Sequence, residues 1–166
     1  MLSCVQFGQY EKILDLGCGY GLIGIYAAKA IQQGDVWMTD RDPLALDYAT
    51  RNSVLNHVED IKVIKSDGFY DLRETNFTKI LCNPPYHVDF SVPKHFIEKG
   101  FNRLVVGGSL WMVTKRKTWY SNKLRSIFGS VRVRVVDNYF VFEATKKSMS
   151  YANQTTRSPA DLRRRS

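Results

Sequence analysis

The stretch "KILDLGCGYGLIGIYAAKAI", Lys12 to Ile31, gives the strongest indication of the fold of this chain. Its apolar start predicts a buried strand over residues 12–16, and its apolar end predicts a helix over residues 21–31. The loop between them is rich in glycine, which allows a tight turn and a close approach of the backbone to a ligand. Read from Gly19, the loop matches G-x-G-x-x-G. This match alone is weak evidence, because a tight turn without a ligand needs the same glycines.

The same alternation of short apolar runs and amphipathic stretches continues to residue 144. Further strands are expected over residues 35–40, 61–67, 78–83 and 109–115, and further helices over residues 42–56, 91–105 and 119–129. Residues 131–144 predict two strands joined at Asp137-Asn138, which is typical of an antiparallel hairpin. This order predicts an α/β fold: a Rossmann-like, doubly wound, mostly parallel sheet with a C-terminal antiparallel β-hairpin.

Length and composition limit the class of protein. The 166 residues suit one domain, which we expect over residues 1–146, followed by a flexible basic tail over residues 147–166. No run approaches the roughly 18 apolar residues of a membrane span, and the start lacks the pattern of a signal peptide. The three cysteines form no C-x-x-C pair, so neither a disulfide framework nor a metal site is indicated. These features favour a cytoplasmic protein.

The net charge of +8 is unevenly distributed along the chain. Residues 1–76 carry 7 Lys/Arg and 11 Asp/Glu, whereas residues 77–166 carry 17 Lys/Arg and 5 Asp/Glu. The segment "TKRKTWYSNKLRSIFGSVRVR" holds seven basic residues and no acidic one, with Trp119, Tyr120 and Phe128 among them. A basic half raises the local concentration of polyanions and favours a nucleic-acid partner, although solvated helix and strand faces give the same pattern.

Four expected strands end in residues that could form a site: Asp15 with its glycines, Asp40, Asp67-Gly68 and Asn83-Pro84-Pro85-Tyr86. The carboxyl ends of parallel strands meet at one edge of a sheet, where ligands of such folds bind. A carboxylate at Asp15 would repel a pyrophosphate and attract a cationic ligand. Asp40 could accept both hydroxyls of a ribose, in a nicotinamide or an adenosyl ligand alike. Asp67 could accept from an adenine amino group, or it could cap a turn.

The order of "LDLGCGYG", "TD", "SDGF" and "NPPY" resembles the class I S-adenosylmethionine-dependent methyltransferases over residues 12–145. It is most similar to the small-domain group that contains the bacterial ribosomal RNA guanine-N2 methyltransferases. The resemblance implies S-adenosyl-L-methionine as the cofactor, with S-adenosyl-L-homocysteine as the product. The cofactor-binding residues it suggests are Asp15, Gly17, Gly19, Gly21, Asp40, Arg41, Asp67, Gly68 and Asn83.

The same relatives usually carry the pattern F-S-x-x-x-x-D-x-G-S ahead of the first strand, where it helps to close the cofactor pocket. Nothing in "MLSCVQFGQYE" matches this pattern. We therefore expect a more open pocket and weaker cofactor binding than in relatives that carry the pattern.

The "NPPY" loop suits a planar nitrogen acceptor. The Asn83 side-chain oxygen and the Pro84 carbonyl could accept the two hydrogens of an amino group and aim its lone pair at a methyl group, without a general base. The prolines fix the direction of that carbonyl, since the Pro84 ring fixes φ and Pro85 restricts the residue before it. Tyr86 could stack on the base. The alternative is a rigid loop without a ligand, and Cys82 beside it is best interpreted as a core residue.

The leading prediction is methylation of an exocyclic amino nitrogen of an RNA base, with guanine N2 of ribosomal RNA preferred. The base must be unpaired or flipped out to reach the loop, and His87 could touch the RNA or orient the loop. Expected partners are RNA, either ribosomal RNA or the small ribosomal subunit, and no membrane; we expect a monomer. Alternatives are N6-adenine methylation of tRNA or DNA, glutamine-N5 methylation of a protein, and a non-catalytic RNA-binding module. A nicotinamide-dependent oxidoreductase is disfavoured by Asp15.

Overall fold

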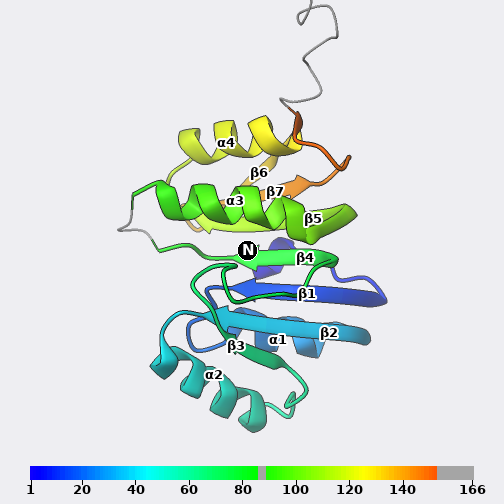
Figure 1. Ribbon diagram of the computed structural model, residues 1–166, viewed down its shortest axis with the longest axis vertical. Coiled ribbons are helices and arrows are strands. Elements are labelled where there is room, and N and C mark those ends of the chain that lie inside the picture. Colours follow the sequence, from blue (N-terminus) through cyan, green and yellow to red (C-terminus); the bar gives the residue numbers. More distant parts are fainter. Residues whose placement is uncertain (86–88, 153–166) are drawn as a thin grey trace, which may run out of the picture.

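The computed structural model describes residues 1–85 and 89–152 (Figure 1). Within them, seven strands form one sheet in the order β3-β2-β1-β4-β5-β7-β6. All neighbouring pairs from β3 to β5 are parallel, while β7 is antiparallel to both β5 and β6. This arrangement confirms the predicted mostly parallel α/β sheet with an antiparallel hairpin at its C-terminal end.

The elements follow one another as the sequence predicts. The strands are β1 (Tyr10–Leu16), β2 (Gln33–Asp40), β3 (Lys62–Lys65), β4 (Phe77–Cys82), β5 (Leu104–Thr114), β6 (Arg132–Val136) and β7 (Tyr139–Thr145). The helices are the 3-10 helix η1 (Leu2–Cys4), α1 (Leu22–Ala30), α2 (Pro43–Leu55), α3 (Ser91–Arg103) and α4 (Thr118–Phe128). Among the described residues, no helix is long and apolar enough to span a membrane.

Two apolar clusters cover the two faces of the sheet. On one face, α3 and α4 bury residues such as Phe96 and Leu124 against side chains of β1, β4, β5 and β7. On the other face, α1 and α2 bury Ile25 and Ala49 against Ile13 of β1 and against β2. Because helices cover both faces of the central strands, consecutive residues such as Ile80, Leu81 and Cys82 of β4 are apolar and fully buried.

The turn between β6 and β7 is the two-residue loop that the sequence predicts. Asp137 and Asn138 have φ values of 48° and 64°, and Val136 pairs with Tyr139 across the turn. Asn and Asp tolerate this left-handed region better than most residues, and such turns match the twist of antiparallel strands. The prediction of a hairpin at Asp137-Asn138 is therefore confirmed.

The junction of α3 and β5 differs from the expectation. The helix predicted over residues 91–105 ends at Arg103, and the strand predicted to begin at residue 109 begins at Leu104. The sheet continues through Gly107 and Gly108, because their backbones exchange hydrogen bonds of 2.8 Å with the backbone of Lys146. A Cβ at Gly108 would lie 2.9 Å from the Phe77 carbonyl oxygen, so glycine is required by a close strand approach and does not end the helix.

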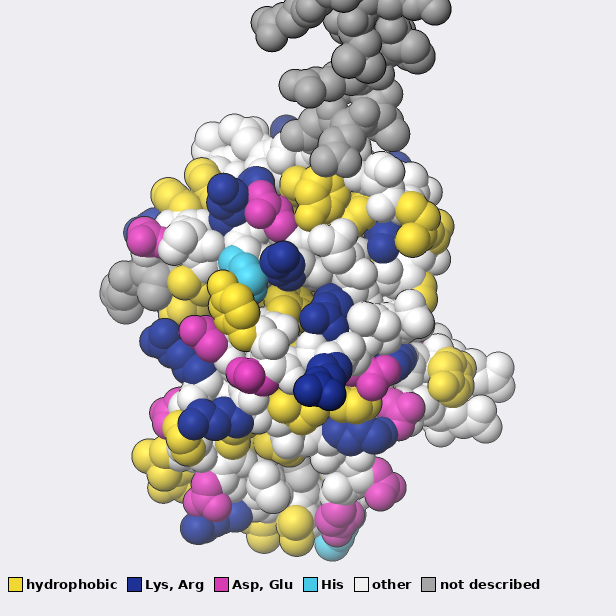
Figure 2. Space-filling view, viewed as in Figure 1, with side chains coloured by type: hydrophobic (Ala, Val, Ile, Leu, Met, Phe, Trp, Pro, Cys, Tyr) yellow, Lys and Arg dark blue, Asp and Glu magenta, His cyan; other side chains and the backbone are white. Residues whose placement is uncertain are grey.

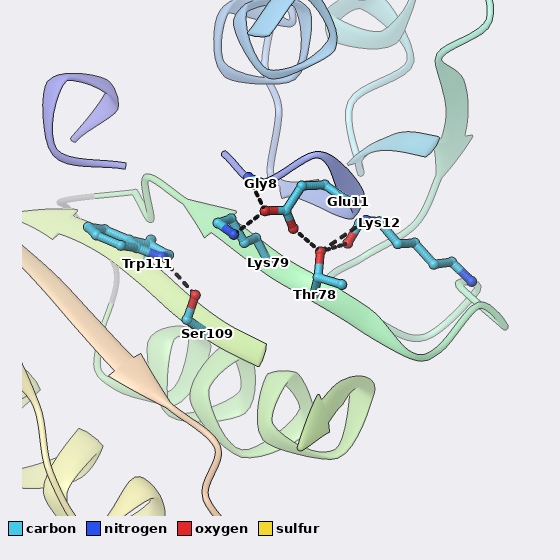
Figure 3. A network of polar contacts seen from close by, with 7 residues as sticks. All are labelled: Gly8, Glu11, Lys12, Thr78, Lys79, Ser109 and Trp111. Carbon is cyan, nitrogen blue, oxygen red and sulfur yellow. Dashed lines mark hydrogen bonds and ion pairs between the residues drawn. The ribbon is translucent and has the colours of Figure 1, made fainter. Parts of the chain in front are cut away.

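A buried polar network ties the start of β1 to β4 (Figure 3). The carboxylate of Glu11, only 3% exposed, accepts hydrogen bonds from Lys79 and Thr78 and from the Gly8 backbone N–H at 2.7 Å. Burial opposes ionisation of Glu11, but these three donors together outweigh it and lower the pKa of the carboxyl group. The network holds the segment before β1 against the centre of the sheet.

Helix α1 lies unusually close to β2 because of Gly24. A Cβ at this position would lie 2.5 Å from Cγ and Sδ of Met38, which is fully buried. We expect Gly24→Ala to lower the free energy of unfolding by about 2 kcal/mol, because the added methyl group must displace a packed side chain. Urea unfolding of the variant and the parent chain measures this difference.

Gly100→Ala in α3 is the matched control. A Cβ at Gly100 would make only ordinary contacts, the nearest at 3.7 Å to Ile80 and Phe69. Its higher helix propensity should leave stability unchanged or raise it by up to about 1 kcal/mol. Equal destabilisation by the two substitutions would contradict close packing at Gly24 as the cause.

Candidate functional site

The ends of β1, β2, β3 and β4 surround a cavity of about 270 Å³ at the carboxyl edge of the sheet. Its walls come from each strand end that the sequence marked and from the first turns of α3. The lining residues are Gly17, Gly19, Asp40, Arg41, Ser66, Asp67, Gly68, Asn83, Pro85, Val92 and Phe96. The structure thus brings most of the predicted site residues together around one hollow.

The glycine loop presents its backbone to this cavity. Gly17 and Gly19 have φ values of 73° and 55°, and a Cβ at either position would meet no atom within 4 Å. Side chains there would be strained and would project into open space that the loop otherwise leaves to a ligand. The N–H groups of Gly17 and Cys18 donate to the Thr39 carbonyl oxygen at 2.9 Å, so the loop is bound to the end of β2.

Asp40 faces the cavity with both carboxylate oxygens held. One oxygen accepts from the Gly19 N–H at 2.9 Å and the other from the Asp42 N–H at 3.0 Å. An ionised carboxylate offers about four lone-pair sites, so each oxygen can still accept from a ligand hydroxyl. This geometry suits the predicted hydrogen bonds to two ribose hydroxyls.

Asp15 lies beneath the loop and does not line the cavity. It is fully buried, its Oδ2 accepts from the Gly24 N–H at 2.8 Å, and its Oδ1 has no hydrogen-bond partner among the described residues. Burial raises the pKa of Asp15 to about 7; the Gly24 hydrogen bond opposes this shift and the charge of Asp40 adds to it. The carboxyl group therefore fixes the start of α1 from below, and its attraction for a cationic ligand stays a prediction.

The raised pKa predicts a loss of stability with rising pH. Below the pKa of the unfolded state, near 4, Asp15 is protonated in both states and does not change the free energy of unfolding. Above that pH, ionisation of Asp15 favours the unfolded chain, until the carboxyl group of the folded chain also ionises near pH 7. Between pH 5.5 and 8.5 we expect Asp15 to lower the free energy of unfolding by about 2 kcal/mol. Urea unfolding at both pH values measures the change.

Asp15→Asn is the comparison variant, because the amide keeps an acceptor for the Gly24 N–H and cannot ionise. The stability difference between this variant and the parent chain should shift by about 2 kcal/mol between the two pH values, in favour of the variant at high pH. Parallel pH profiles of the two proteins would exclude Asp15 as the titrating group.

The Asn83-Pro84-Pro85 segment follows β4 at the centre of the sheet, between β1 and β5. Asn83 and Pro85 are exposed and line the cavity, whereas Pro84 is buried. The predicted stacking residue Tyr86, and His87 beside it, lie outside the described residues. The loop and the glycines that were expected to bind the cofactor thus share one hollow.

Two apolar residues of the cavity wall were not predicted as site residues. Val92 and Phe96 lie four residues apart on α3, and the rings of Phe96 and Phe69 form a T-shaped pair with centroids 6.4 Å apart. The sequence could have indicated both residues, because they closely follow the Asn-Pro-Pro segment and their spacing of four places them on the same face of a helix. Ser66 was also missed; its hydroxyl donates to the Gly68 carbonyl oxygen and accepts from the Asp71 N–H.

Gly21, also predicted to bind the cofactor, lies away from the cavity wall. It precedes α1 with a φ of 93°, and a Cβ there would lie 3.2 Å from Ala49 and Met38. The requirement for glycine here is therefore explained by its positive φ and by the close approach of the start of α1 to α2 and β2. A direct contact of Gly21 with a ligand stays a prediction.

The cysteines near the site are core residues. Cys82 is fully buried at the end of β4, and burial strongly raises the pKa of its thiol; burial also raises the pKa of the Cys18 thiol. A protonated, inaccessible thiol does not act as a nucleophile, which agrees with the packing role expected for Cys82. No group of three or more His, Cys, Asp or Glu side chains that could hold a metal ion occurs in residues 1–85 and 89–152.

The strand order, the open glycine backbone and the carboxylate at the end of β2 are arranged as the resemblance to S-adenosylmethionine-dependent methyltransferases predicts. The family model described as "Methyltransferase small domain" matches residues 1–143 of this chain. The chain therefore belongs to the methyltransferase small-domain family, as the sequence motifs indicated.

Individual relatives agree with this family. The chain is 30% identical over 145 residues to "Ribosomal RNA large subunit methyltransferase G" of Photobacterium profundum, covering 83% of this chain and 39% of that protein. It is 31% identical over 139 residues to the protein YbxB of Bacillus subtilis, covering 81% and 69% of the two chains. The chain thus spans well under half the length of the methyltransferase G relatives.

A solved structure extends the comparison to the fold. The 16S rRNA N2 G1207 methyltransferase RsmC of T. thermophilus, in complex with AdoMet and guanosine, superposes with a TM-score of 0.73 at 27% identity. The match covers 82% of this chain and 38% of RsmC. A ribosomal protein L11 methylase from Lactobacillus delbrueckii subsp. bulgaricus has a TM-score of 0.75 at 18% identity, which shows the fold alone.

Proposed function

We propose that this chain transfers a methyl group from S-adenosylmethionine to an exocyclic amino nitrogen of a base in RNA, with guanine N2 of ribosomal RNA as the preferred acceptor. One observation carries the proposal: Asn83 and Pro85 line the same cavity as the glycine loop and Asp40. A nitrogen held at the Asn-Pro-Pro segment is then within reach of a ligand held on the glycines. The names of methyltransferase G and of RsmC refer to ribosomal RNA, and the name of RsmC also refers to N2 of a guanine, which supports this choice of acceptor.

The residues around the cavity fit the cofactor. Asp40 can accept from the ribose hydroxyls, Asp67 can accept from the adenine amino group, and the bare backbone at Gly17 and Gly19 leaves room for the amino-acid part. Val92 and Phe96 supply an apolar wall. When bound, S-adenosylmethionine supplies a methyl carbon activated by its positively charged sulfur.

The acceptor nitrogen needs orientation more than it needs a base. The lone pair of an exocyclic amino group is delocalised into the purine ring, so the group is planar and a poor nucleophile. The Asn83 oxygen and the Pro84 carbonyl oxygen accept its two hydrogens and hold the lone pair toward the methyl carbon. As the N–C bond forms and the S–C bond breaks, the nitrogen would gain positive charge, which these two oxygens would stabilise until a proton is lost to water.

The test is methylation in vitro with isotopically labelled S-adenosylmethionine. Unmodified transcripts of both ribosomal RNAs, free and assembled into subunits, are incubated with the chain, and the digested nucleosides are analysed by mass spectrometry. Label in N2-methylguanosine is the expected result. Label in N6-methyladenosine would replace guanine by adenine as the acceptor.

The remaining outcomes select other functions. Label in protein, recovered as N5-methylglutamine, would replace the RNA acceptor by a protein. Binding of RNA without transfer to any acceptor, in a chain that binds S-adenosylmethionine in calorimetry, would contradict the catalytic proposal and favour a non-catalytic RNA-binding module.

A further inference from the structure

Ion pairs neutralise some of the basic residues of the C-terminal half and leave others uncompensated. Figure 2 shows acidic and basic side chains interspersed over one face of the molecule, so the excess must be located residue by residue. Seven Lys and Arg, and no Asp or Glu, lie between residues 115 and 136. Lys123 pairs with Glu98, and Arg132 and Arg134 pair with Glu143.

Three consecutive cations are left without a carboxylate. Lys115, Arg116 and Lys117 are exposed and form no ion pair within residues 1–85 and 89–152. Arg125 shares this property but lies in the last turn of α4. The three consecutive residues therefore form a local concentration of uncompensated positive charge, which we call the 115–117 cluster.

Aromatic rings on both sides hold the 115–117 cluster in place. The Arg116 guanidinium lies 5.2 Å from the centroid of Phe90, Lys115 Nζ lies 5.1 Å from that of Tyr139, and Lys117 Nζ lies 5.8 Å from that of Phe140. Phe90 is itself stacked on Trp119, with centroids 4.4 Å apart and an interplanar angle of 18°. A ring attracts a cation without neutralising it, so all three charges stay available to an anion.

The cluster lies at the same edge of the sheet as the candidate site. Cys82 pairs with Met112 in the parallel register, so the residues after β5 leave the sheet beside the Asn-Pro-Pro segment. Figure 1 shows the connection from β5 to α4 at the end of the sheet where α3 begins. Phe90 precedes α3 directly, two residues before Val92 of the cavity wall. The cluster and the cavity are therefore joined through the first turn of α3.

We propose that the 115–117 cluster, with the Phe90–Trp119 stack, binds the unpaired RNA strand that flanks the methylated nucleotide. The inference rests on the proposed function for the choice of RNA. Closely spaced cations match the charge of successive phosphates, and aromatic residues interleaved with cations suit exposed bases of a single strand. An unpaired strand is also what the cavity requires, since a base inside a helix cannot reach Asn83.

The test compares two triple variants with the same change in charge. Lys115→Gln/Arg116→Gln/Lys117→Gln removes the cluster, whereas Lys29→Gln/Arg125→Gln/Lys147→Gln removes three exposed cations at the opposite edge, where α1, α4 and β7 end. Binding of a fluorescent 12-nucleotide unpaired RNA and of the corresponding duplex is measured by anisotropy between 50 and 300 mM salt, without cofactor.

Removing the cluster should weaken binding of the unpaired RNA at least about tenfold and reduce the slope of log K against log salt by about 2. The control triple should change the slope by less than half of this. The proposal would be overturned if both triple variants lost the same affinity, or if the parent chain bound the duplex as tightly as the unpaired RNA. It would also be overturned if the parent chain bound neither RNA, and that result would favour an acidic protein partner. Because the readout is binding, a chain that binds RNA through the cluster without methylating it would separate this inference from the proposed function.

Discussion

Replacing Asn83 by alanine is expected to lower kcat of methyl transfer by about a thousandfold. The amide oxygen is proposed to hold one hydrogen of the acceptor amino group and to stabilise the charge that develops on nitrogen; removing one such group from a preorganised site costs a factor of this size. Asn83 is exposed on the cavity wall, so we expect the variant to fold as the parent chain does. Single-turnover transfer to RNA measures the rate.

The Kd for S-adenosylmethionine should change by less than about threefold in the same variant, because Asp40 and the glycine loop are intact. Asn122→Ala is the control, since Asn122 is an exposed asparagine on α4 and does not line the cavity. A loss in cofactor affinity as large as the loss in rate would contradict a role confined to the acceptor.

Asp40→Ala is expected to show the opposite pattern, with a Kd for S-adenosylmethionine raised about a hundredfold. The substitution removes the proposed hydrogen bonds of a carboxylate to ribose, and it also frees the Gly19 and Asp42 N–H groups that the carboxylate holds. Charge-assisted hydrogen bonds of this kind contribute about 1.5–3 kcal/mol each. Isothermal titration calorimetry measures the affinity directly.

With cofactor near saturation, kcat of the Asp40→Ala variant should stay within about tenfold of the parent value, because the acceptor loop is unchanged. Asp60→Ala is the control: Asp60 is exposed before β3 and does not line the cavity. The control should keep the parent's affinity and its increase in melting temperature on cofactor addition. A rate loss for Asp40→Ala that persists at saturation would show that the two functions are not divided between Asn83 and Asp40.

Most helices and strands could be predicted from short patterns in the sequence. Apolar runs followed by glycine, Asp-Pro and Asp-Asn mark strand ends, a helix start and a hairpin turn, and the structure confirms each of these elements. The helix predicted over residues 91–105 and the strand predicted from residue 109 left Gly107 and Gly108 between two elements, because glycine pairs usually end an element. There the glycines serve a strand that passes within 2.9 Å of the Phe77 carbonyl oxygen.

The parallel sheet and the strand ends that surround the cavity could be predicted from the sequence, because strands and helices alternate along the chain and strands connected through a helix run parallel. The position of each side chain at the cavity, by contrast, depends on how the helices pack on the sheet. Asp15 and Asp40 end neighbouring strands, yet Asp15 is buried against α1 while Asp40 faces the cavity. Likewise, Glu98 and Glu143 pair with some cations and leave Lys115 to Lys117 free of carboxylates among the described residues. Burial and pairing depend on side chains far apart in the sequence, which meet only when the helices pack on the sheet.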